Sequence, residues 1–201
     1  LTAVLNLDTG VMTFEGTGEF YKNDFDSDEF VYLNILGDKL REVAIPEGIT
    51  YIPNSLFSYC SGLERITLPS TLKTIGEGAF SYCGSLQRIA IPAKVSSIGF
   101  EYAGFASSPF SGCSSLMQID VDPANRSYCN DADGALYTKD KATLVAFPGG
   151  RSGSYTVAAG TKMIASYAFS YSSLSSITLP DQLSTIEYGA FEYCWELAGL
   201  V

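Results

Sequence analysis

Residues 63–85, LERITLPSTLKTIGEGAFSYCGS, decide the fold of this chain because the same pattern returns several times along it. Self-similarity at a fixed short period is the signature of a repeat architecture. Regular units are spaced by 23 residues, and one unit is lengthened. The leucines that open the units are Leu40, Leu63, Leu86, Leu116, Leu174 and Leu197. A unit this short cannot bury its apolar side alone, so stacked units must share one continuous core.

Each part of the unit predicts a local structure. The alternation at residues 66–68 (Ile-Thr-Leu) predicts a short strand with one buried face. Pro69 ends that strand because proline has no N–H to donate to a ladder. The aliphatic residues that follow at three-residue steps indicate a turn or a very short second strand. Residues 78–80 (Gly-Ala-Phe) predict a single helical turn that points the phenylalanine into the core.

The whole pattern, L-x-x-I-x-I/L-P-x-x-(V/L)-x-x-I-G-x-x-A-F-x-x-C, resembles the BspA-type leucine-rich repeats of bacterial cell-surface proteins over roughly residues 30–201. The resemblance implies an α/β fold: a right-handed, horseshoe-like solenoid with a parallel sheet on one face and short helical turns opposite. It also implies adhesion and protein binding rather than catalysis. The protein is then expected outside the cell or on the cell surface.

We expect one leucine-rich-repeat domain over residues 1–201. Residues 1–39 would form an N-terminal cap, because residues 8–10 (Asp-Thr-Gly) lie between two apolar runs and signal a β-hairpin. Repeats occupy residues 40–122 and 155–201. Residues 123–154 are predicted to form an inserted hairpin, a feature that the family resemblance also implies. The array looks truncated at its C-terminal end, since residues 197–201 begin another unit, so the chain is expected to be part of a longer protein.

Composition excludes several classes of function. The net charge is −10 with only 12 Lys and Arg, and nucleic acids or anionic membranes require clustered basic residues. Histidine is absent, which removes histidine-centred acid–base and nucleophilic chemistry and most zinc sites. No apolar run is long enough to cross a bilayer. We therefore expect no enzyme, no cofactor, no metal site and no membrane insertion.

Four of the five cysteines fill one repeat position, which leaves two interpretations. The first is a buried column of small apolar side chains, as is typical of free cysteine. The second is a set of disulfides between neighbouring units, which parallel stacked side chains disfavour. The four are Cys60, Cys83, Cys113 and Cys194, while Ser172 takes the same position in one unit and Cys129 lies outside the pattern.

Three irregular segments each allow a bland and a functional interpretation. Residues 21–30 carry Asp24, Asp26, Asp28 and Glu29, which suit a calcium loop or a solvated connection. Residues 131–134 (Asp-Ala-Asp-Gly) suit a calcium ligand set or an ordinary turn. Residues 100–109 bring Phe100, Tyr102 and Phe105, which suit an exposed recognition bump or a small satellite core.

Two stacked columns are candidate binding surfaces. On the open sheet face we single out Arg65, Thr67, Arg88, Gln118, Asp120 and Thr178, which could equally be plain solvated sheet. A tyrosine ladder, Tyr59, Tyr82, Tyr171 and Tyr193, precedes the cysteine position and could equally be packing between repeats. The expected partner is a protein of a host or neighbouring cell. The alternatives are a structural spacer and a glycan-binding module.

Overall fold

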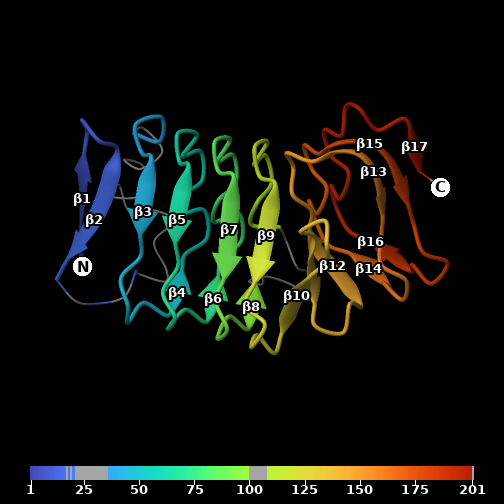
Figure 1. Cartoon of the computed structure of the whole chain (residues 1–201), viewed down its shortest axis with the longest axis horizontal. Helices are drawn as coiled ribbons and strands as arrows, with labels where there is room; N and C mark the ends of the chain where they lie inside the picture. Colours follow the sequence, from blue (N-terminus) through green and yellow to red (C-terminus); the bar gives the residue numbers. More distant parts are fainter. Residues whose placement is uncertain (17, 19, 21–35, 100–107, 201) are drawn as a thin grey trace.

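Each repeat makes one turn of a β-solenoid, and the turns stack in a row between the two ends of the chain (Figure 1). The computed structural model describes residues 1–16, 18, 20, 36–99 and 108–200. Parallel strands in register form the first face, as in Val43 opposite Ile66 and Ile89 opposite Ile119. These strands are β3 (Glu42–Ala44), β5 (Arg65–Thr67), β7 (Arg88–Ile91), β9 (Gln118–Val121), β13 (Ser152–Thr156), β15 (Ser173–Thr178) and β17 (Gly199–Leu200).

A second face consists of two-residue strands, one a turn, where the sequence predicted a turn or a very short strand. Thr74 lies opposite Tyr51 on one side and Ser97 on the other, so these strands are also parallel and in register. Their isoleucines point inward: Ile52, Ile75 and Ile98 are fully buried. The strands are β4 (Tyr51–Ile52), β6 (Thr74–Ile75), β8 (Ser97–Ile98), β14 (Met163–Ile164) and β16 (Thr185–Ile186).

The helical turn expected at Gly-Ala-Phe is wrong, and with it the α/β class. None of the described residues is helical; the third side of each unit consists of turns. An α-helix needs hydrogen bonds between residues four apart. Here the Phe57 N–H donates to the Ala79 carbonyl at 2.9 Å, and the Tyr59 N–H donates to the Ser81 carbonyl at 2.7 Å. Part of the backbone therefore bonds from one unit to the next, and the bonds kept within a turn join residues three apart, as from the Ser58 N–H to the Ser55 carbonyl at 3.0 Å.

Phenylalanine and cysteine columns run through the core beneath these turns. Phe80 is fully buried and stacks between Phe57 and Phe110, with ring centroids 5.7 and 5.8 Å away. None of the five cysteines forms a disulfide, and Cys60, Cys83 and Cys113 are buried while Cys194 is half-buried, which favours the buried-column interpretation. The Cys83 and Cys113 thiols donate to carbonyl oxygens of the preceding unit, each at 3.1 Å. Burial raises the pKa of Cys113 to about 12, so the thiol stays neutral.

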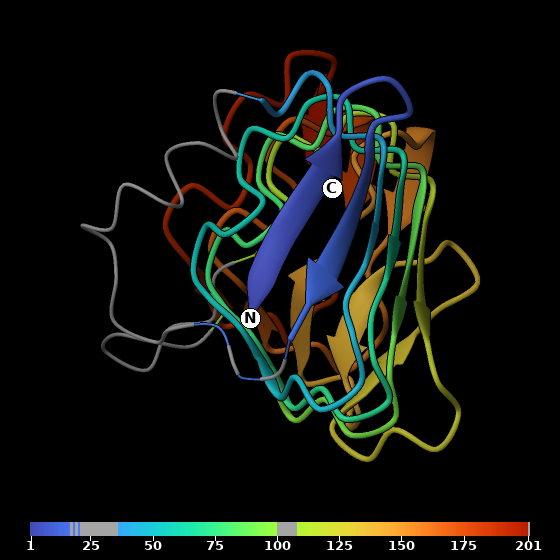
Figure 2. The same cartoon turned by 90° about the vertical axis from the view of Figure 1, so that its left-hand side faces the viewer.

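The expected N-terminal hairpin is present as β1 (Thr2–Asn6) and β2 (Val11–Glu15). The Asn6 side chain accepts the N–H groups of Asp8 and Thr9, and Gly10 takes the positive φ of 72° that the turn requires. β2 pairs in parallel with β3, so the hairpin extends the first face and lies across that end of the solenoid (Figure 2). The buried side chain of Met12 joins the main core there.

The inserted segment forms three antiparallel strands, β10 (Tyr128–Asn130), β11 (Leu136–Thr138) and β12 (Thr143–Ala146). The sequence predicted the last two strands and missed β10. β12 then pairs in parallel with β14, so the insertion also supplies one strand of the second face. Within the described residues the strands of the first face belong to three hydrogen-bonded sheets, with no pairing from β5 to β7 or from β9 to β13. The division between the two core clusters runs through the insertion, which contributes residues to both.

Candidate binding surfaces

The arginines of the predicted strand stripe are paired with carboxylates of neighbouring strands. Arg65 contacts Glu42 with an N–O distance of 2.7 Å. Arg88 grips both carboxylate oxygens of Asp120, one of them at 3.1 Å, and this contact lowers the pKa of Asp120. Thr67 follows Arg65 by two residues on β5 and is exposed. The positive charges of both stripe arginines are therefore compensated by carboxylates of neighbouring strands.

The insertion also divides this stripe. The Gln118 side chain packs against Gly134 of the insertion, so closely that a Cβ on that glycine would lie 2.9 Å from the Gln118 amide carbon. Thr178 is exposed on β15, which belongs to the separate sheet beyond β13. The six stripe residues therefore do not form one surface. Five lie together on the N-terminal part and Thr178 lies apart.

The tyrosine ladder, by contrast, is continuous. Tyr59 stacks on Tyr82 with centroids 4.6 Å apart, Tyr82 meets Tyr171 edge-on at 5.5 Å, and Tyr171 packs on Tyr193 at 4.7 Å. The Tyr82 and Tyr171 hydroxyls are 3.3 Å apart, and this hydrogen bond raises the pKa of Tyr171. Trp195 extends the ladder, with its ring 5.6 Å from Tyr193 and 79% of its surface exposed. The sequence analysis missed Trp195 because it lies one residue beyond the cysteine position.

The ladder tyrosines all have left-handed backbone conformations, with φ between 56° and 62°. An L-residue pays about 1–2 kcal/mol for this region, which glycine occupies freely. Glycine does take the position once: Gly112 has a φ of 75°, and the Tyr82 ring lies so close to it that a Cβ there would be 2.6 Å from the ring. This gap lets Tyr82 reach across to Tyr171. Stacking of the rings offsets part of the backbone cost.

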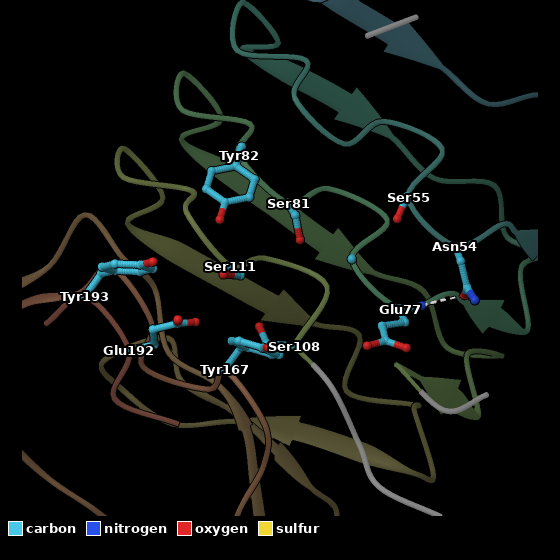
Figure 3. Close-up of a pocket in the computed structure, with 11 residues that line it drawn as sticks. Asn54, Ser55, Glu77, Ser81, Tyr82, Ser108, Ser111, Tyr167, Glu192 and Tyr193 are labelled. Atoms are coloured by element: carbon cyan, nitrogen blue, oxygen red, sulfur yellow. Dashed lines mark hydrogen bonds between the residues drawn. The ribbon is translucent and has the colours of Figure 1, made fainter. Parts of the chain in front are cut away.

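Beside the ladder lies a cavity of about 480 Å³, which we term the junction pocket (Figure 3). It is lined by Asn54, Ser55, Glu77, Gly78, Ser81, Tyr82, Ser108, Ser111, Tyr167, Glu192 and Tyr193. These residues come from turns on both sides of the insertion. Two of the ladder tyrosines, Tyr82 and Tyr193, form part of its wall.

Charge in the junction pocket comes from Glu77 and Glu192. Partial burial raises the pKa of the Tyr167 hydroxyl, and Tyr188 and both glutamates raise it further. Tyr167 therefore lies near both carboxylates, and Figure 3 draws its ring between Glu77 and Glu192. The sequence offered one signal that we did not use: Glu192 stands where the other units have serine, at Ser58, Ser81, Ser111 and Ser170.

The acidic segment at residues 131–134 has the contacts of an ordinary turn, which is one of the two interpretations given above. The Asp131 side chain accepts the N–H groups of Asp133 and Ala135, and its second oxygen accepts the Tyr155 hydroxyl at 2.6 Å. Asp133 forms an ion pair with Arg151, with an N–O distance of 2.6 Å.

The other two irregular segments, the candidate calcium loop at residues 21–30 and the segment with Phe100, Tyr102 and Phe105, lie outside the described residues. Within the described part, no cluster of His, Cys, Asp and Glu could hold a metal ion, and no helix is long and apolar enough to span a membrane.

A family profile described as BspA type leucine rich repeat region matches residues 35–132 and 146–200, in 6 copies. No curated protein matches the chain significantly. Two solved structures resemble it closely: the pneumococcal vaccine antigen PcpA, at 30% identity and a TM-score of 0.72, and a leucine-rich cell-surface protein of Faecalibacterium prausnitzii, at 33% identity and 0.70. Both matches cover over four-fifths of this chain, 81% and 83%.

The chain spans only part of those relatives, 39% of the length of the first and 43% of the second. A leucine-rich repeat protein of Eubacterium ventriosum matches 98% of this chain and 68% of its own, with a TM-score of 0.57. At 23% identity this last likeness concerns the fold alone.

Proposed function

Because this chain belongs to the BspA-type leucine-rich repeat family, we propose that it is a non-catalytic binding module of a bacterial cell-surface or secreted protein. Its partner is a protein of a host or neighbouring cell. One similar structure is described as a cell-surface protein and another as a vaccine antigen, which supports this location. The absence of histidine removes histidine-centred acid–base chemistry, which agrees with a binding role.

The observation that carries the proposal is the continuous aromatic ladder from Tyr59 to Trp195. Tyrosine and tryptophan dominate the energetics of protein interfaces because they offer rigid apolar area with a polar tip. Tyr59 and Tyr193 are 56% and 42% exposed, so their faces are available to a partner. The ladder also holds its tyrosines in a costly backbone conformation, and such strain collects at functional sites.

The proposal is tested with the folded domain immobilised in a surface plasmon resonance panel of purified extracellular-matrix and bacterial surface proteins. We expect at least one protein to bind, and the double variant Tyr59→Ala/Tyr193→Ala to weaken that binding at least tenfold. Met117→Ala is the matched control because Met117 is similarly exposed, at 49%, and lies beside β9. A folded domain that binds no protein in the panel refutes the binding role.

Two alternatives rest on specific observations. A structural spacer is favoured by the self-neutralised stripe, in which Arg65 and Arg88 are already paired. A glycan-binding module is favoured by the exposed tyrosine faces, on which sugars can stack. Glycan-array binding that the Tyr59→Ala/Tyr193→Ala variant abolishes, without binding to any protein, would select the second alternative over a protein partner.

A further inference from the structure

The junction pocket exists because small residues lie between large ones on the turn face. The lengthened unit contributes Ser108 and Ser111 to the floor. Ser111 is linked directly to Ser170 beyond the insertion, with their hydroxyl oxygens 2.6 Å apart. Tyr82 and Tyr193 of the ladder also line the pocket. The pocket is therefore a consequence of joining two stretches of repeats through the insertion, and no single unit contains it.

The charged side chains among the described lining residues of the pocket are all of one sign. Glu77 and Glu192 line it, and no lysine or arginine is among its lining residues. Neither carboxylate forms an ion pair within the described part of the chain, whereas Glu42, Asp120 and Asp133 all do. The chain as a whole carries a net charge of −10, which reinforces the negative potential of a concave site.

The walls add a second preference for a cation. Tyrosine rings attract ammonium and guanidinium groups through the negative faces of their π systems. Tyr82, Tyr167 and Tyr193 all line the pocket (Figure 3). A neutral ligand such as a sugar could donate hydrogen bonds to the carboxylates but would leave their negative charge uncompensated. A cationic group would bring opposite charge to a pocket lined by two carboxylates and could also contact the faces of the tyrosine rings.

We propose that the junction pocket receives a single lysine or arginine side chain from the surface of the partner protein. This inference rests on the proposed binding function and assigns it a recognition chemistry. The volume of about 480 Å³ suits one long side chain rather than a folded element. The tyrosine ladder then contacts the apolar surface of the partner around this lysine or arginine, and the pocket favours partners with a positive side chain at this point.

The test is a chemical-shift titration of the ¹⁵N-labelled domain with three probes. These are an acetyl-Gly-Arg-Gly-amide peptide, the same peptide with citrulline, which has the shape of arginine without its charge, and methyl glucoside. We expect the arginine peptide to shift the amides of Ser81, Tyr82 and Glu192, with an affinity at least tenfold above that of the citrulline peptide. Equal affinity of the two peptides, no shift at these amides, or shifts with methyl glucoside alone would overturn the proposal.

Variants assign the effect to the carboxylates. Glu77→Gln/Glu192→Gln keeps the side-chain shapes and should reduce the arginine preference at least tenfold, while Glu196→Gln, an exposed residue outside the pocket lining, should leave it unchanged. A preference that survives the double substitution contradicts the proposal. Panel binding separates the two hypotheses: if a protein still binds but the arginine preference is absent, the pocket assignment fails and the binding role stands.

Discussion

Substitution of Phe80 by alanine tests whether the stacked core carries the stability of this solenoid. Phe80 has no exposed surface, and rings of the units before and after it lie 5.7 and 5.8 Å away. Removing a buried phenylalanine costs about 3–5 kcal/mol through lost transfer energy and the cavity left behind. Each aromatic pair adds about 0.5–1.5 kcal/mol beyond burial. We therefore expect Phe80→Ala to lower the free energy of unfolding by about 5 kcal/mol, the upper end of the range for removing a buried phenylalanine.

Phe191→Ala is the matched control for this measurement. Phe191 stands at the C-terminal end of its column, where it is only partly buried and stacks on one neighbour, Phe169, at 5.2 Å. Its removal should cost about half as much, roughly 2 kcal/mol. Urea unfolding followed by circular dichroism gives both values. Equal losses for Phe80→Ala and Phe191→Ala, or a loss below about 1 kcal/mol for the first, would refute the stacking argument.

Three further predictions concern other contacts. Ala158→Pro removes the N–H that donates to the buried Tyr137 hydroxyl at 3.1 Å, so it should destabilise the fold by about 1–3 kcal/mol in urea unfolding, although other units carry proline at this position. Burial raises the pKa of Cys60 from 9.0 to about 12, so the thiol ionises more readily in the unfolded chain, and native stability should fall as pH rises from about 9 towards 12. Mass spectrometry after thiol labelling at pH 8 should show the half-buried Cys129 modified before the buried Cys60. Tyr59→Gly relieves a φ of 62° while losing one ring stack, so thermal melts should change by less than about 1 kcal/mol while partner binding weakens.

The strands, the columns and the hairpin could be predicted because each depends on residues within one unit. Ile66 and Thr67 alternate between core and solvent as their spacing requires. The helical turn failed because it depends on the backbone of neighbouring units, whose carbonyls take the hydrogen bonds that a helix would keep. One signal was available: Gly112 replaces a ladder tyrosine in one unit, and such an exchange with glycine indicates a positive φ.

The site was less predictable than the fold because it depends on which units become neighbours in space. The 23-residue repeat placed Glu42 and Arg65 at the same position of neighbouring units, so their pairing could have been read from the sequence. Arg88 pairs instead with Asp120, two residues beyond Gln118, its partner in the strand register. The junction pocket joins residues as far apart as Glu77 and Glu192. Their proximity follows from how the insertion links β9 to the later turns, and no local pattern encodes that distance.

The direction of the hydrogen bonds has a mechanical consequence. The bonds that join one turn to the next run along the long axis of the stack, and the two chain ends lie at opposite ends of that axis (Figure 1). A force pulling the ends apart therefore opens these bonds one strand at a time instead of shearing many together. Each regular turn of 23 residues that detaches releases about 80 Å of extended chain. Under tension the domain should therefore lengthen stepwise at low force and so limit the force that it transmits.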